Sequence, residues 1–121
     1  MYRPLPDKIT IKDSDIEGLG LFSKVKIKNK SFIGITHVKH EEFQDKYIRT
    51  PLGGFYNHSK NPNVIKLASE TLPKYNFGES FKENINDFLK IDKISNYLFL
   101  VSLKNIEPGE EIVAKYTFYD F

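Results

Sequence analysis

Residues 54–63 read Gly-Phe-Tyr-Asn-His-Ser-Lys-Asn-Pro-Asn, and the interpretation of the whole sequence starts from this stretch. Asn, Ser and Pro favour turns, because their side chains bond nearby backbone groups or fix the φ angle. Phe55 and Tyr56 would anchor the start of the stretch in a core. We therefore predict a rigid, partly buried polar loop, which is where binding and catalytic groups concentrate. Composition alone favours a simpler interpretation, a hairpin turn capped by His58.

The bulk properties of the chain indicate one folded domain. Its 121 residues are enough to bury a sizeable core, and the 10 Phe and 7 Tyr would supply much of it. The net charge of +2 is too small to indicate a nucleic-acid partner. The lack of cysteine excludes disulfides and thiolate zinc sites. No long apolar run or apolar leader occurs, so we expect an intracellular protein without a membrane partner.

Short strands separated by turn signals dominate the pattern. Alternating polar and apolar residues predict half-buried strands, and the apolar run of residues 97–103 predicts a strand buried on both faces. The turn Glu107-Pro108-Gly109-Glu110 has the residues of type II, with proline and glycine at its centre. The other predicted strands cover residues 8–12, 21–23, 25–28, 32–35, 64–67 and 112–116.

Two segments favour helices instead. We expect a short helix over residues 41–49, ending before Pro51 because the residue preceding a proline avoids the α region. Residues 79–91 also have apolar positions at helical spacing. The spacing of His37 and His40 fits either a metal site or an exposed helix. The predicted fold class is therefore β-rich α+β.

One pattern occurs twice in the sequence. Residues 21–33 and residues 100–112 both consist of an apolar strand, a short polar link and a second strand. We interpret the two segments as pseudo-equivalent hairpins.

Three motifs then follow one another in a fixed order. They are Gly18-Leu19-Gly20, then Asn57-His58-Ser59 with Pro62-Asn63, and finally Gly109-Glu110-Glu111-Ile112 with Tyr116. Together these motifs resemble the SET-domain family of protein lysine methyltransferases over essentially the whole chain. The likeness extends to the minimal stand-alone viral SET proteins, which also carry Asn-His-Ser-Lys.

The resemblance implies a fold of several small β-sheets with a C-terminal pseudoknot. In that fold, residues 57–59 lie beside the strand that leads to Tyr116. Residues 1–121 would form a single SET domain with variable segments at about residues 37–52 and 66–96. We interpret Ser14 as part of a turn, and Glu110 and Glu111 as structural residues that flank a turn.

The same resemblance implies the chemistry and the site residues. S-adenosylmethionine would be the methyl donor, S-adenosylhomocysteine the product, and no metal would take part. Tyr116 would be the catalytic residue. Ala114 is small where many members hold an aromatic residue, which would leave room for multiple methylation. The donor would contact Gly18, Leu19, Gly20, Leu21, Phe22, Asn57, His58, Tyr119 and Phe121. The substrate channel would include Tyr47, Phe55, Ala114 and Phe118.

Each of these side chains could instead be structural, with Tyr116 and the channel aromatics as plain core residues. The expected partner is a lysine-bearing protein substrate, with a histone tail as a candidate, and no nucleic acid. Minimal viral relatives suggest a homodimer and, for a viral protein, a location in the host cytoplasm or nucleus. The rival hypothesis is a catalytically weak SET-like module that binds a protein or peptide.

Overall fold

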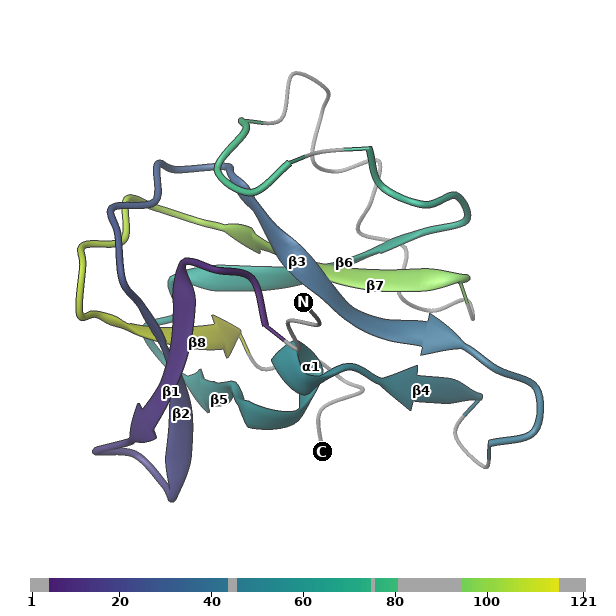
Figure 1. The fold of residues 1–121 in the computed structure, drawn as a ribbon, viewed down its shortest axis with the longest axis horizontal. Helices are drawn as coiled ribbons and strands as arrows, with labels where there is room; N and C mark the ends of the chain where they lie inside the picture. The colour runs from purple at the N-terminus through teal and green to yellow at the C-terminus, as the bar shows by residue number, and fades with distance from the viewer. Residues whose placement is uncertain (1–4, 44–45, 75, 81–94, 116–121) are drawn as a thin grey trace.

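A computed structural model describes residues 5–43, 46–74, 76–80 and 95–115, and it confirms a β-rich chain. Within these ranges there are eight strands and one five-residue helix (Figure 1). None of the described segments is a helix long and apolar enough to cross a membrane. The strands are β1 (Ile9–Asp13), β2 (Leu19–Ser23), β3 (Phe32–Lys39), β4 (Tyr47–Arg49), β5 (Asn57–Ser59), β6 (Val64–Ser69), β7 (Tyr97–Ser102) and β8 (Glu111–Lys115), and the helix is α1 (Pro51–Phe55).

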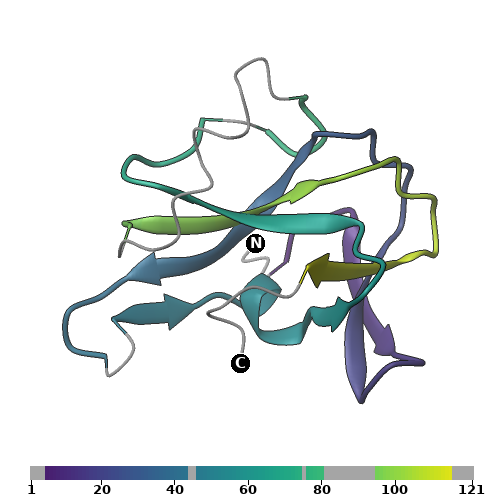
Figure 2. The same cartoon turned by 180° about the vertical axis from the view of Figure 1, so that it is seen from behind.

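The strands form an open mixed sheet in the order β1-β2-β8-β6-β7-β3-β4, with β5 paired to β8. Strand β8 pairs antiparallel with β2 but parallel with β5 and β6. Figure 2 shows from behind how β6 and β7 run side by side across the molecule. The expectation that residues 57–59 lie beside the strand leading to Tyr116 is therefore confirmed, although Tyr116 itself lies outside the described residues.

The core lies where β7 crosses the middle of the sheet. Every residue of β7 after Tyr97 is buried, which confirms the prediction of a strand covered on both faces. One core cluster gathers Leu21, Leu52, Leu100 and Ala114 among others, and a second one contains Phe32 and Phe99, whose ring centroids are 5.7 Å apart. Apolar burial of this kind is the main stabilising term of a fold.

The helix expected over residues 41–49 is wrong. Tyr47–Arg49 form strand β4, in which Ile48 pairs with Val38 of β3. The helix begins only after Thr50, whose hydroxyl oxygen accepts a hydrogen bond from the Gly53 amide at 3.3 Å, and proline fits its first turn. Pairing with β3 thus overrides the weak local preference of this segment. Residues 81–94, most of the second expected helix, lie outside the described residues.

The two segments with a repeated pattern are related, but they are not hairpins. Strand β2 pairs with β8 and strand β7 with β3, so the first strand of each segment pairs with the second strand of the other. Between these strands the two polar links run antiparallel and meet at one bridge, Ile27 with Ile106. The sequence predicts a strand over residues 25–28. Only Ile27 pairs in this segment, so it is not a regular strand.

Candidate functional site

The loop between β1 and β2 is the first part of the candidate site. Ser14 begins it, with its amide donating to the Gly18 carbonyl at 2.8 Å and its hydroxyl oxygen accepting from the Ile16 amide at 2.9 Å. Gly18 has a φ angle of +48°, a conformation that glycine adopts at little cost. The loop tip is exposed and mixes the apolar side chains of Ile16 and Leu19, 51% and 47% exposed, with the exposed acids Asp15 and Glu17. The Gly-Leu-Gly motif thus combines a tight turn with an accessible edge.

Asn57, the first residue of β5, joins this loop to β8. Its side-chain nitrogen Nδ2 lies 3.2 Å from the Glu17 carbonyl and 3.3 Å from the Leu19 carbonyl. The same nitrogen lies 3.1 Å from Ser14 Oγ and 3.0 Å from Glu111 Oε2. A single side chain therefore holds together the three motifs that the sequence spreads over the chain.

Gly20 makes room for this contact. It is buried, and a Cβ atom at this position would overlap the Glu111 carboxylate and stand 3.1 Å from Ser14 Cβ. Ser14 Oγ in turn donates to the Glu111 carboxylate, at 2.8 Å from Oε1. Only glycine at position 20 lets the carboxylate approach the loop closely enough for this hydrogen bond.

Asn63 has a structural role. It is 2% exposed, and its side chain donates to the Glu111 carbonyl at 2.7 Å and to Glu110 Oε2 at 3.0 Å. Its Oδ1 accepts from the Val113 amide at 2.9 Å. Asn63, the second asparagine of the Asn-His-Ser…Pro-Asn motif, thus holds β8 in position by hydrogen bonds, and Glu110 accepts one of them.

Of the other residues predicted to contact the methyl donor, some lie in the core and some are partly exposed. Leu21 is fully buried, so only its backbone could face a ligand. Phe22 is half-buried beneath the Lys12 ammonium, 5.9 Å from its ring centroid. His58 is half-buried against Tyr56, with 5.3 Å between the ring centroids. Their roles stay predictions. Tyr119 and Phe121 lie outside the described residues, as do Tyr116 and Phe118.

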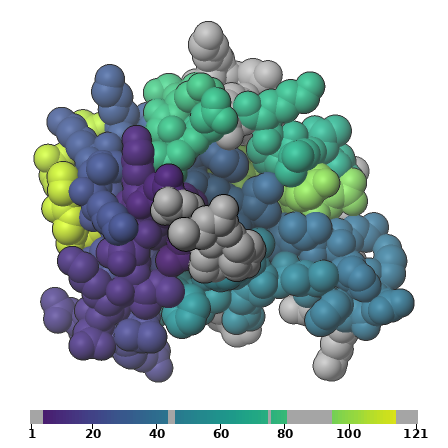
Figure 3. Space-filling view, viewed as in Figure 1, coloured from purple at the N-terminus to yellow at the C-terminus, as the bar shows by residue number. Residues whose placement is uncertain are grey.

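The predicted channel residues do not gather in the described part of the chain. Ala114 is 1% exposed within the core, and Phe55, at the end of α1, is 36% exposed. Tyr47 lies on β4, at the opposite end of the strand order from the Gly18 loop, as Figures 1 and 3 also show. Their assignment to a channel stays a prediction.

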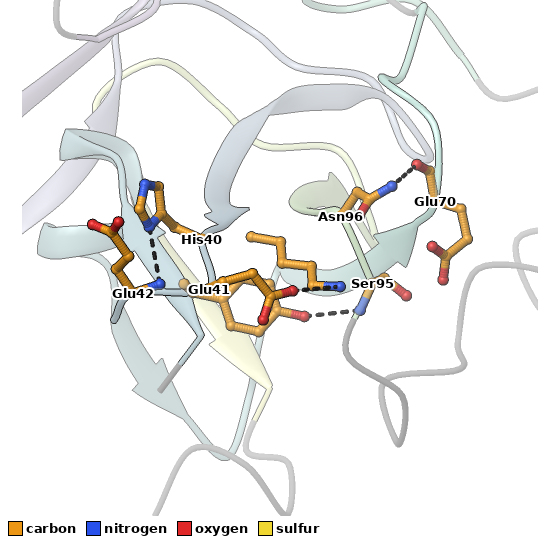
Figure 4. A network of polar contacts seen from close by, with 8 residues as sticks. His40, Glu41, Glu42, Glu70, Ser95 and Asn96 are labelled. Carbon is orange, nitrogen blue, oxygen red and sulfur yellow. Dashed lines mark hydrogen bonds and ion pairs between the residues drawn. The ribbon is translucent and has the colours of Figure 1, made fainter. Parts of the chain in front are cut away.

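Tyr47 bonds Ser95, one of the residues of the polar network that Figure 4 shows. Its hydroxyl oxygen accepts from the Ser95 amide at 3.0 Å. Burial, and secondarily the Glu70 carboxylate, raise the pKa of Tyr47 above its ordinary value of 10.0, while the Ser95 hydrogen bond and two lysines oppose the rise. A pocket of about 320 Å³ lies in the same region, lined by Val38, Lys39, Glu41, Asn96 and Tyr97.

The two histidines considered as metal ligands form hydrogen bonds with neighbouring residues of the chain. His37 Nδ1 lies 2.9 Å from Thr36 Oγ1, and His40 Nδ1 accepts from the Glu42 amide at 3.2 Å. Over the described ranges, no group of three or more His, Asp or Glu side chains is placed to hold a metal ion.

Sequence reasoning missed the joint contact of Ser14 and Glu111, which it interpreted as structural residues, and the burial of Lys66. Ser14 and Glu111 complete the contacts of Asn57, but they stand 97 positions apart, so no local pattern connects them. Lys66 of β6 is only 7% exposed, and its Nζ lies 3.4 Å from the Tyr56 hydroxyl. A lysine inside an apolar strand was the one available signal, because lysine is almost never fully buried unless it is paired.

Comparisons with known proteins address the family and the fold. A family model of the SET domain matches residues 18–117. The structure is similar to that of a Plasmodium falciparum protein provisionally assigned as a histone methyltransferase. The two share 25% sequence identity and a TM-score of 0.61, over 94% of this chain and 96% of that one. The methyltransferase domain of human PR domain-containing protein 2 is also similar, with 14% identity and a TM-score of 0.52 over 97% and 82% of the two chains. At that identity the likeness concerns the fold alone. No curated protein sequence matches the chain.

Proposed function

Because the chain belongs to the SET-domain family, we propose that it is a protein-lysine N-methyltransferase that uses S-adenosylmethionine as methyl donor. The observation that carries the proposal is the convergence of three sequence motifs on the Asn57 side chain. The Plasmodium neighbour, provisionally assigned as a histone methyltransferase, supports a protein substrate.

The residues around Asn57 fit the amino-acid end of the proposed donor. Carbonyl oxygens of Glu17 and Leu19 and the Glu111 carboxylate make this place rich in acceptors, which suits an ammonium group. Gly18 and Gly20 let the backbone turn and approach closely there. Asn57 and the Gly18–Phe22 backbone would hold the donor, with His58, Tyr119 and Phe121 as further proposed contacts.

S-adenosylmethionine supplies a methyl group on a positively charged sulfur. Its transfer to an amine is an in-line displacement, so the main task of the protein is to align the reacting atoms. We assign this orienting role to Tyr116. An aromatic channel would strip water from the incoming lysine, and desolvation lowers the pKa of that amine, so that it loses its proton. No strong general base is required.

Finer features of the proposal follow from the resemblance to minimal viral SET proteins. They are a pseudoknotted C-terminal strand, one SET domain over residues 1–121, a homodimer, and an intracellular location, which for a viral protein is the host cytoplasm or nucleus. The small side chain of Ala114 would leave room for multiple methylation. A histone tail is the candidate substrate.

Purified protein is expected to bind S-adenosylmethionine in calorimetry and to transfer radiolabelled methyl groups to core histones or to a bacterial lysate. Tyr116→Phe should lower kcat by about 10²-fold, the effect of misplacing reacting groups, and change donor affinity much less. Donor binding no better than background would contradict the proposal. In the matched control, Tyr75→Phe changes a tyrosine that has no role in the proposed site and should leave kcat unchanged.

A catalytically weak peptide-binding module is the competing function. It would bind histone peptides without methylating any of them, and Tyr116→Phe would then leave peptide binding unchanged. The convergence of Gly20, Asn57 and Glu111 favours the enzyme, because a peptide-binding module has no need of this acceptor-rich contact.

A further inference from the structure

The amide of Asn57 has only one orientation that its surroundings accept. Its Nδ2 faces four oxygens at 3.0 to 3.3 Å, namely two backbone carbonyls, a carboxylate and the Ser14 hydroxyl. Carbonyls and carboxylates accept hydrogen bonds but cannot donate them. If the amide were flipped, its Oδ1 would face three groups that offer no proton.

Ser14 reinforces this choice. Its hydroxyl proton goes to the Glu111 carboxylate, at 2.8 Å from Oε1 and 2.9 Å from Oε2. The lone pairs of Ser14 Oγ are then left to accept from Asn57 and from the Ile16 amide. Glu111 therefore fixes the hydroxyl, and the hydroxyl and the carboxylate together fix the amide.

The consequence concerns the other end of the amide. With Nδ2 directed into the loop, Oδ1 of Asn57 points away from it, and no described residue donates a hydrogen bond to this oxygen. Polarised by the carboxylate behind it, Oδ1 is a strong acceptor for a cationic donor group.

We propose that Glu111 and Ser14 are positioning residues that hold Asn57 Oδ1 outward, so that the site selects ligands carrying the α-ammonium group of the methyl donor. This proposal rests on the proposed function and deepens it. It gives Glu111 a role in ligand selection, whereas the sequence suggests only a structural residue beside a turn.

The neighbouring acid provides a matched contrast. Glu110 accepts from Asn63 Nδ2 and from the Glu107 amide, and it is not among the acceptors of the Asn57 amide. Glu110 directly precedes β8 and Glu111 is its first residue; both are partly buried, and both bond an asparagine amide. Only Glu111 should influence ligand selection.

The test measures binding of three ligands by calorimetry, without turnover. They are S-adenosylhomocysteine, its analogue that lacks the α-amino group, and methylthioadenosine, which lacks the whole amino-acid part. The wild type should bind S-adenosylhomocysteine about tenfold to hundredfold more tightly than the analogue, the range of a hydrogen bond to a charged group.

In Glu111→Gln this preference should shrink to about threefold or less, because a glutamine N–H lets the Asn57 amide flip. Methylthioadenosine binding should stay unchanged, and Glu110→Gln should keep the full preference. Ser14→Ala, which retains the charge of Glu111 but frees its carboxylate, should show a smaller loss of the same kind. It also serves as the second variant if Glu111→Gln does not fold.

Two results would overturn the inference alone. One is an unchanged preference in Glu111→Gln and Ser14→Ala, and the other is an equal loss of affinity for all three ligands, which indicates a purely structural role. Failure of the wild type to bind any of the three would instead contradict the proposed function, and the inference with it.

Discussion

The two polar links, residues 23–31 and residues 102–110, form equivalent backbone hydrogen bonds but stabilise their turns with different side chains. The Ile27 and Ile106 amides each donate to the other's carbonyl at 2.8 Å. The amide of Ser23 donates to the Glu110 carbonyl at 3.1 Å, and the amide of Ser102 donates to the Ser31 carbonyl at 3.0 Å. The links are thus reciprocal partners, as in a two-fold symmetric interface.

The difference lies in the turn of each link. Pro108 and Gly109 form one turn, in which Gly109 has a φ angle of +86° and the Glu110 amide donates to the Glu107 carbonyl at 3.0 Å. This confirms the predicted type II turn. The equivalent residues of the other link are Asn29 and Lys30. Lys30 takes a φ angle of +59° in spite of its side chain.

The Asn29 amide, which has no counterpart in Pro108, finds its acceptor in Asn105 Oδ1 at 2.9 Å. The Pro108-Gly109 turn is therefore preorganised by its own residues. The Asn29-Lys30 turn depends on a hydrogen bond to Asn105, a side chain of the other link. The comparison shows that local sequence and long-range contacts can fix the same geometry.

The largest expected effect comes from the residues that the two links share. Ile27 and Ile106 are 1% and 0% exposed. Ile27→Ala and Ile106→Ala should each lower the free energy of unfolding by about 2–5 kcal/mol, as cavity-forming core substitutions do. Equal losses of unfolding free energy in urea denaturation would support the equivalence of the two links. A loss in only one of the two variants would contradict it. The exposed Leu103→Ala is the control and should change little.

A smaller effect is expected from the preorganised turn. Gly109→Ala forces a Cβ atom into the left-handed region and should destabilise the protein by roughly 1 kcal/mol. No atom lies within 4 Å of the added Cβ, so the cost is one of backbone conformation and not of a clash. The midpoint of thermal unfolding measures it. A neutral result would mean that the turn tolerates residues other than glycine.

The smallest effect should have the opposite sign. Lys30→Gly relieves about 1–2 kcal/mol of left-handed strain but makes the unfolded chain more flexible, so a net stabilisation of roughly 0.5 kcal/mol is expected. Lys28→Gly, in the same link but without a positive φ angle, should be neutral or destabilising. Destabilisation by Lys30→Gly would show that the lysine side chain itself matters.

Much of the fold could be predicted where the pattern is local. The apolar run of residues 97–103 is so continuous that only a buried strand fits it, and strand β7 is there. Strand β4 was missed, because Tyr47–Arg49 is too short to show a period and its pairing with Val38 depends on the rest of the sheet. The repeated pattern can be recognised in the sequence. The pairing of its two halves with each other cannot, because an alternation of apolar and polar residues does not specify which strand pairs with which.

The site divides in the same way. Asn57 and the glycines were identified from motifs. The structure brings Asn57 within hydrogen-bonding distance of Glu111, and it places Gly20 where an added Cβ would overlap the Glu111 carboxylate. Ser14 and Glu111 could not be assigned a joint role, because their sequence neighbours explain each of them as part of a turn. The predicted catalytic residue, Tyr116, lies outside the described residues and stays a prediction.

The span of the Asn57 cluster has a consequence for biosynthesis. Ser14 and Asn57 leave the ribosome long before Glu111, which follows Ser14 by 97 positions and Asn57 by 54. Until β8 emerges, the loop, the glycines and the asparagine lack the carboxylate that orders them, and β6 lacks its parallel partner. Such non-local contacts form late in folding. A nascent chain should therefore be unable to capture the methyl donor, and a translation product that stops before β8 would be inert from the start.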